Sequence, residues 1–138
     1  MNRQDFQRLA EERVANAQAL LATQQNASGA YYMAGYAVEC VLKACIAKQT
    51  QQYDYPDKKT VENSYTHNVE LLLKTAKIED DFKVYRKGNP DFGTNWDIVK
   101  DWSENSRYET HTQSEAENLL TAIIDSKSGV LQWIQRYW

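Results

Sequence analysis

Residues 30–48 combine an apolar helical pattern with side chains that can take part in acid–base chemistry. Four polar side chains follow one another at steps of three and four residues and so share one helix face: Tyr32, Tyr36, Glu39 and Lys43. A carboxylate and an ammonium group in a mostly buried helix need partners, because an unpaired buried charge is costly. This face is therefore either a structural latch or part of a binding site.

The two histidines are candidates for proton transfer, because histidine changes charge near neutral pH. His67 follows Thr66, which we expect to cap a helix, and it is either a ligand-binding residue or a structural hydrogen-bonding group. His111 follows Arg107 by four positions. The two side chains share a face if this segment is helical, whereas a loop before Thr112 would separate them.

Cys40 and Cys45 are the only cysteines, and they lie five residues apart on the same expected helix. At 3.6 residues per turn they point about 140° apart, so they cannot form a disulfide with each other there. Free thiols in an apolar helix favour core packing and a reducing compartment. The cysteines and histidines lack zinc-site spacing and no glycine-rich phosphate loop is present, so we expect no metal site and no cofactor.

The length of 138 residues fits a single domain that spans 1–138. Two prolines and five glycines are few, which favours helices. The net charge of −3 means that any RNA or nucleotide site must be a local patch. The N-terminal segment lacks the apolar core of a signal peptide, and no apolar run is long enough to span a bilayer. We therefore expect a cytoplasmic protein without membrane contact.

Hydrophobic periodicity predicts an all-α fold, an up-and-down antiparallel bundle of four to five helices. The expected helices are 4–24, about 29–49 with Ser28 as its N-cap, a third capped by Thr66, short helices at 80–85 and 95–104, and 113–137. Residues 50–65 are expected to form a loop. Thr112 and Glu115 match a capping box at the start of the last helix, which either bends at Gly129 or breaks into two helices at 126–129.

Four tryptophans and nine tyrosines are many for this length. Aromatic side chains can stack on bases, but more often they fill cores or interfaces. We expect the segment 96–102 to cover one end of the bundle, and Trp133 and Trp138 to close a dimer. Gly35 is expected to allow close approach of a packing element or a ligand.

Three segments resemble, in order, those of HEPN domains, the nucleotide-binding helical domains shared by prokaryotes and higher eukaryotes. Residues 32–44 resemble the second HEPN helix, 66–72 the threonine–histidine start of the next helix, and 106–108 the arginine–tyrosine before the last long helix. The first and last helices agree in length and pattern, so the resemblance covers nearly the whole chain. It implies a HEPN-like bundle that usually dimerises and works near nucleotides or RNA.

Many HEPN domains are metal-independent ribonucleases, often toxins, whereas others are non-catalytic partners of a small nucleotidyltransferase or nucleotide-binding appendages. The ribonucleases carry an arginine, a polar residue and, after four to six intervening residues, a histidine. Cleavage at the 2′-hydroxyl needs a proton carrier and a cation for the developing phosphorane charge. Here only three residues separate Arg107 from His111, and Tyr108 takes the polar position.

We therefore expect a dimeric, non-catalytic module that binds nucleotide or RNA, a partner nucleotidyltransferase, or both. The candidate binding residues are Tyr32, Tyr36, Glu39, Lys43, His67 and Tyr108. One alternative is a metal-independent endoribonuclease with His111 as general acid/base and Arg107 as phosphate clamp, or with His67 as the proton carrier. Another is a purely structural dimerisation domain. In the structural reading, Glu39 pairs with Arg107 or Tyr108, and His111 is an exposed loop residue.

Overall fold

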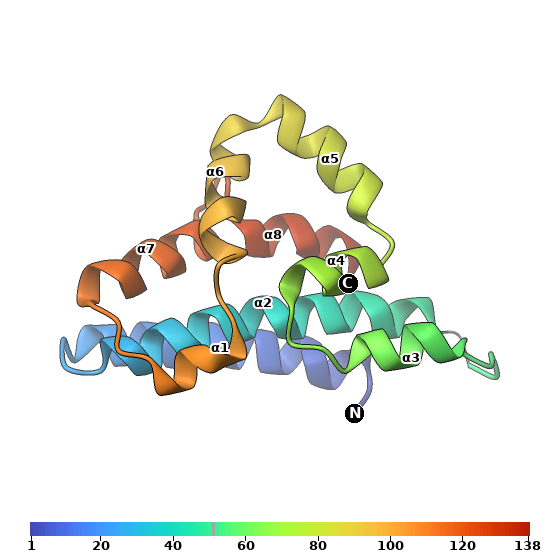
Figure 1. Ribbon diagram of the computed structural model, residues 1–138, viewed down its shortest axis with the longest axis horizontal. Coiled ribbons are helices and arrows are strands. Elements are labelled where there is room, and N and C mark those ends of the chain that lie inside the picture. The colour runs from blue at the N-terminus through green and yellow to red at the C-terminus, as the bar shows by residue number, and fades with distance from the viewer. Residues whose placement is uncertain (51) are drawn as a thin grey trace.

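The computed structural model describes residues 1–50 and 52–138, which form eight α-helices and two 3-10 turns and contain no strand (Figure 1). The elements are α1 (Arg3–Ala22), α2 (Ala27–Gln49), α3 (Lys58–Ser64), α4 (Val69–Thr75), α5 (Glu79–Gly88), α6 (Pro90–Val99), η1 (Glu104–Tyr108), α7 (Gln113–Ile124), α8 (Val130–Ile134) and η2 (Gln135–Tyr137). The all-α prediction is confirmed. The helices outnumber the four to five expected, because the predicted loop contains α3, the predicted C-terminal helix is divided into α7 and α8, and the short helices α5 and α6 are counted separately. No described helix is both long and apolar enough to cross a bilayer.

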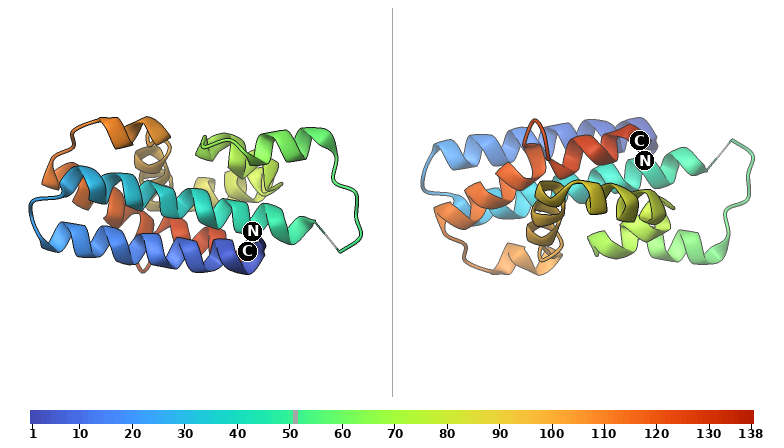
Figure 2. Two further views of the ribbon diagram at one scale, coloured as in Figure 1. Left: turned by 90° about the horizontal axis from the view of Figure 1, so that it is seen from below. Right: turned by 90° about the horizontal axis from the view of Figure 1, so that it is seen from above.

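Helix α2 lies at the centre of the fold, as its apolar composition predicted. Alanine, valine, leucine and cysteine occupy most of its faces, and 12 of its 23 residues are buried. Helix α1 runs antiparallel beside it, and α7 covers a further side (Figures 1 and 2). Of the polar side chains on α2, that of Glu39 is therefore held inside the bundle, whereas Lys48 and Gln49 near the end of the helix are exposed.

The starts of α1 and α2 differ in how their backbone groups are satisfied. Asn2 and Asp5 form a reciprocal capping box at α1, with both hydrogen bonds at 3.0 Å. Helix α2 begins after Asn26, so the prediction that Ser28 is its N-cap was wrong. Ser28 lies in the first turn, where its Oγ accepts a hydrogen bond from the backbone N–H of His111 at 2.9 Å.

The segment expected to be a loop, 50–65, contains α3. Asp57 caps this helix by accepting hydrogen bonds from the backbone N–H of Thr60 at 2.9 Å and from its hydroxyl at 2.6 Å. Asn68 rather than Thr66 caps α4, by accepting a backbone N–H three residues further on at 2.9 Å. Thr66 instead accepts the N–H of Asn68 at 3.2 Å, so it supports the cap without being the cap.

Helices α5 and α6 project above the bundle (Figure 1). Helix α5 includes the predicted helix at 80–85. Helix α6 begins at Pro90 and ends at Val99, earlier at both ends than the predicted 95–104. Proline is pre-organised for the first helical position, which explains the earlier start.

A cluster of aromatic rings joins α5 and α6 to α8. The ring centroid of Trp133 lies 5.9 Å from that of Phe82, 5.4 Å from that of Phe92 and 5.7 Å from that of Tyr85. Trp133 is 2% exposed within one chain, so it has no surface left with which to close a dimer. That predicted role was wrong for Trp133, whereas Trp138 is only partly buried.

The C-terminal helix is broken between Ile124 and Val130, so the prediction of one helix over 113–137 was wrong and the two-helix alternative is confirmed. The carboxylate of Asp125 accepts hydrogen bonds from the N–H groups of Lys127 at 2.9 Å and Ser128 at 2.7 Å, in competition with continued helix. Gly129 follows as the N-cap of α8, where a Cβ would overlap backbone carbonyl oxygens of the turn.

Candidate functional site

Glu39 places a carboxylate inside the bundle, where only 2% of the residue is exposed. Its Oε1 accepts a hydrogen bond from Nζ of Lys43, one turn further along α2, at 2.9 Å. Nδ1 of His67 lies 3.0 Å from each of its two oxygens. These two partners compensate a charge that would be costly to bury alone. The expectation that Glu39 pairs with Arg107 or Tyr108 was wrong.

His67 connects the buried carboxylate to the surface. It precedes the Asn68 cap of α4 rather than lying in the first turn, and its side chain is 44% exposed. While Nδ1 faces Glu39, Nε2 lies 3.1 Å from Oε2 of Glu104 in η1. A neutral imidazole can donate to only one of these carboxylates, whereas a protonated ring can donate to both.

Arg107 extends this network to the exposed end of η1. Its guanidinium lies 3.9 Å from Oε2 of Glu104, a distance too long for a hydrogen bond, and its side chain is 46% exposed. The guanidinium also lies 5.1 Å from the ring centroid of Tyr108, which is 79% exposed. Among residues 1–50 and 52–138, no acceptor lies within hydrogen-bonding distance of the Arg107 side chain, which stands next to an open aromatic ring.

His111 belongs to a different cluster. It lies beyond η1 in extended chain, and its ring stacks on Tyr31 with centroids 3.6 Å apart. Nδ1 lies 2.9 Å from Oε2 of Glu115, and Nε2 lies 3.2 Å from Oε2 of Glu109. Because the side chain is only 11% exposed, the prediction of an exposed loop histidine was wrong. Arg107 lies in η1, which ends at Tyr108, and 109–112 form a loop before α7, so no shared helix aligns Arg107 with His111.

The surroundings of His111 also perturb its neighbours. Its hydrogen bond, followed by that of Thr112, holds the pKa of the Glu115 carboxyl below its usual value. Burial, with negative charge on Asp101 and other nearby carboxylates, raises the pKa of the Tyr31 phenol. The side chain of Glu115 contacts His111. Its backbone N–H donates a hydrogen bond to Thr112 at 3.1 Å, so Thr112 caps α7 as predicted.

Tyr32 and Tyr36 pack within the protein rather than beside Lys43. Tyr32 stacks between Tyr36 and Trp102, with centroids 5.9 Å and 6.0 Å away. The Arg13 guanidinium lies 5.6 Å from the ring centroid of Tyr36. Gly35 allows Trp102 to approach α2, since a Cβ there would overlap the indole ring. The close approach predicted at Gly35 is thus made by a tryptophan of this chain.

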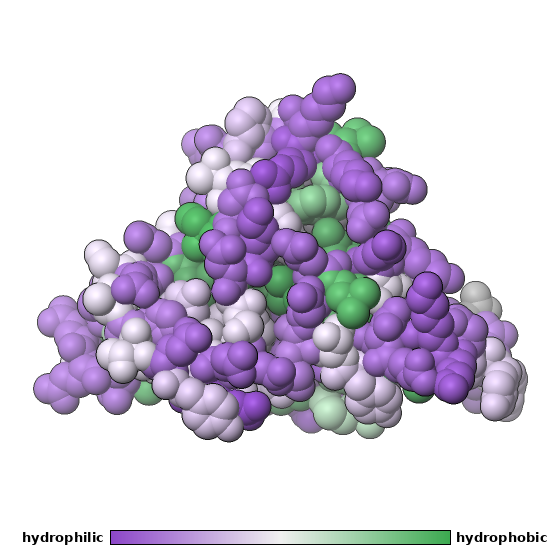
Figure 3. All heavy atoms as spheres, viewed as in Figure 1, coloured by the Kyte–Doolittle hydropathy of each residue, from purple (hydrophilic) through white to green (hydrophobic). Residues whose placement is uncertain are grey.

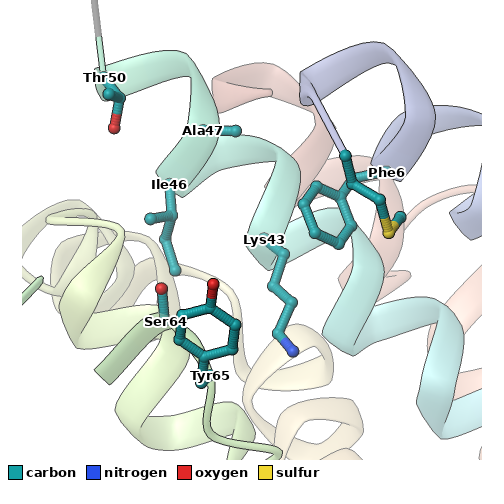
Figure 4. A pocket seen from close by; sticks show the side chains of 8 residues that line it. Phe6, Lys43, Ile46, Ala47, Thr50, Ser64 and Tyr65 are labelled. Carbon is teal, nitrogen blue, oxygen red and sulfur yellow. The ribbon is translucent and has the colours of Figure 1, made fainter. Parts of the chain in front are cut away.

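Lys43 also lines a pocket of about 380 Å³ between the start of α1, the second half of α2 and the end of α3 (Figure 4). Phe6 and Ile46 supply apolar surface, and Tyr65, which is 77% exposed, supplies an aromatic ring. An ammonium group has three donors, and Glu39 accepts one of those of Lys43. The pocket therefore offers a hydrogen-bonding cation among apolar and aromatic side chains.

Glu104 is the residue of this network that the sequence argument missed. Its signal was present, because Glu104 precedes Arg107 by three positions, a spacing at which opposite charges meet on a helical turn. The described residues contain no group of three or more His, Cys, Asp or Glu side chains that could hold a metal ion.

Comparisons of this chain with protein-family models, with curated proteins and with solved structures gave no match. The resemblance to HEPN domains therefore stays a prediction that rests on three sequence segments.

Proposed function

We propose that this chain is a HEPN-like helical module that binds nucleotide or RNA and does not cleave it. The observation that carries the non-catalytic part is the position of His111. Its ring is stacked on Tyr31, lies against two carboxylates and is 11% exposed, so it has little access to a 2′-hydroxyl. Arg107 belongs to the separate network around Glu104.

The binding part is supported by the exposed face of that network. Arg107 and Tyr108 present a guanidinium beside an open aromatic ring. Arginine suits phosphate, and aromatic rings stack on bases without regard to sequence. Lys43 and Tyr65 repeat the combination of a cation and an exposed ring at the pocket between α1, α2 and α3. A nucleotide or a short RNA segment has the complementary chemistry.

The experiment is fluorescence anisotropy with a labelled RNA of about 20 nucleotides and, separately, a fluorescent ATP analogue. We expect binding of at least one probe, and a loss of about five-fold or more in affinity for Arg107→Ala, which corresponds to about 1 kcal/mol. Arg8→Ala is the matched control. Arg8 is exposed and, like Arg107, lies near an acid three positions earlier in the sequence, with 3.4 Å between its guanidinium and Asp5. Absence of binding to both probes contradicts the proposal, as does an equal loss for Arg8→Ala.

The same resemblance implies a homodimer and, as a partner, a nucleotidyltransferase. Light scattering on the purified chain measures its mass in solution and so tests the homodimer directly. A mass near twice 16.0 kDa is expected, and a mass of 16.0 kDa at micromolar concentration contradicts a dimer. Co-purification with a small nucleotidyltransferase, compared with the Arg107→Ala variant, tests the second.

The alternative function is a metal-independent endoribonuclease, and one observation favours a particular form of it. His67 and Arg107 both contact Glu104, so a half-exposed imidazole and a guanidinium lie around one carboxylate. Such a group has a proton carrier and a cation for phosphorane charge. This enzyme would cut RNA in excess chelator, and His67→Ala would abolish cleavage while His111→Ala would not.

A further inference from the structure

We propose that a lysine-lined groove between α3 and α4 holds the backbone of single-stranded RNA. This inference rests on the proposed binding of RNA and gives that binding a second site, away from Arg107 and Tyr108. The groove has a volume of about 450 Å³, and its lining includes Lys59, Lys74 and Lys77. Figure 3 shows mostly polar surface at the lower right, where Figure 1 places α3.

The three lysines of this groove have no acidic partner within ion-pair distance among residues 1–50 and 52–138. Neighbouring Lys58 differs, because its Nζ lies 3.6 Å from Glu62. Asp57 is the one acid in the lining, and its carboxylate caps α3 through two hydrogen bonds from Thr60. Three lysines and one aspartate give the lining a formal charge of +2, in a chain whose net charge is −3. The groove is thus a local site for anions.

Lys77 occupies a position at which glycine is the ordinary choice. It follows the last turn of α4 with a φ of 59°, in the left-handed region that costs a residue with a Cβ. The preceding carbonyl, that of Ala76, accepts a hydrogen bond from the side-chain amide of Gln49 on α2. The turn is therefore anchored, and it carries a lysine into the groove at a conformational cost.

An exposed aromatic ring lies next to the lysines. Tyr55 is 99% exposed and lines a hollow of about 310 Å³ whose lining also includes Asp57, Thr60 and Lys77. Asp57, Thr60 and Lys77 line the lysine groove as well, so the two depressions adjoin. Cations that follow the backbone, together with a ring that stacks on a base, are the common features of single-strand binding. A duplex keeps its bases stacked inside and would not use the ring.

The test is anisotropy with labelled oligouridylate RNA of about 20 nucleotides, measured over a range of salt concentrations. The triple variant Lys59→Ala, Lys74→Ala, Lys77→Ala is compared with a control triple, Lys83→Ala, Lys87→Ala, Lys127→Ala, made at exposed lysines elsewhere. Three lost phosphate contacts should reduce the slope of log K against log salt by about 2. We expect the groove triple to lose about ten-fold or more in affinity and the control triple less than about two-fold.

A second set of variants in the same binding assay changes Tyr55. Tyr55→Ala should weaken binding about five-fold or more, whereas Tyr55→Phe keeps the ring and should bind like the parent protein. An unchanged groove triple, an equal loss in the control triple, or tighter binding of a duplex of the same length would overturn the inference, while RNA binding itself would stand. If the parent protein binds no RNA, this inference fails, whereas the proposed function fails only if the ATP analogue is not bound either.

Discussion

His67 and Glu39 lie 28 positions apart in the chain, yet Nδ1 of His67 is 3.0 Å from both oxygens of the Glu39 carboxylate. This contact attaches the α3–α4 connection to the central helix, and Nε2 of the same ring continues to Glu104 in η1. One imidazole, in the α3–α4 connection, therefore contacts both α2 and η1, which are far from it in the sequence. Lys43 and Arg107, the cations of two candidate binding surfaces, reach this junction through Glu39 and Glu104.

Loss of the buried carboxylate should destabilise the fold. Glu39→Gln leaves Lys43, whose side chain is 14% exposed, without its anion, and we expect a cost of about 2 kcal/mol in the free energy of unfolding. Urea denaturation measures this. Glu62→Gln is the matched control, because Glu62 also pairs with a lysine four positions away but in solvent, and it should change stability by less than about 0.5 kcal/mol. Equal stability of Glu39→Gln and the parent protein would show that the buried network is not structural.

Gly35→Ala should destabilise the protein by about 2 kcal/mol, because the added Cβ overlaps the ring of Trp102 and over-packing of a core is costly. Displacement of the indole should also change the tryptophan fluorescence. Gly88→Ala is the control, since nothing lies within 4 Å of a Cβ there and alanine is the better helix former. If the two alanine variants unfold at the same urea concentration, the close approach of Trp102 to α2 is refuted.

Both thiols should be inert in the folded protein. Burial raises the pKa of Cys40 and that of Cys45 to about 12, so almost no thiolate is present at pH 8. A thiol-reactive disulfide reagent should therefore label neither cysteine in native protein and both after denaturation. Rapid labelling of either cysteine without denaturant would contradict the burial of this face of α2.

The contact of Glu115 with His111 should contribute a pH-dependent part of stability. Because the pKa of Glu115 is lowered in the folded state, its stabilisation is present above the ordinary value of 4.5 and is lost as pH falls through the folded value. Glu115→Gln lacks this titration. The difference in unfolding free energy between parent and variant should be largest near pH 7 and smaller near pH 3. A difference that does not vary over this range would show that the contact does not favour the ionised carboxyl.

Lys77→Gly should separate stability from binding. Glycine relieves the left-handed backbone and should raise the unfolding free energy by about 0.5–1 kcal/mol, while the loss of the ammonium group weakens RNA binding. Gln24→Gly is the control, because Gln24 has a φ of 55° in the turn between α1 and α2. It should gain similar stability without any change in binding. Weaker RNA binding of both variants would mean that the backbone change, and not the lysine, is responsible.

The sequence predicted the elements better than their contacts. The central position of α2 followed from its composition, and the Thr112 cap from a local pattern. The pairing of Glu39 with Lys43 also follows from spacing on one helix. The contact of Glu39 with His67, by contrast, depends on the course of residues 52–66, which include the unexpected helix α3. No local rule gives that path, so Arg107 was wrongly considered as the partner of Glu39.

The sequence near residue 125 indicates the break in the C-terminal helix, but the apolar periodicity of 113–137 favours a continuous helix. The cost of Gly129 within a helix appeared small enough for packing to offset. The decisive residue is Asp125. Its carboxylate accepts hydrogen bonds from the N–H groups of Lys127 and Ser128, so these donors have partners although the helix does not continue. An aspartate followed by Ser-Lys-Ser is thus more informative about this boundary than the glycine.

The most direct test of the central claim combines binding and integrity of RNA in one sample. Labelled single-stranded RNA is mixed with the purified protein in excess chelator, its anisotropy is recorded, and the same RNA is then analysed on a denaturing gel. A non-catalytic RNA-binding module predicts a salt-dependent rise in anisotropy and full-length RNA. Fragments that disappear in the His67→Ala variant would contradict the claim and establish the ribonuclease, and an unchanged anisotropy would contradict RNA binding itself.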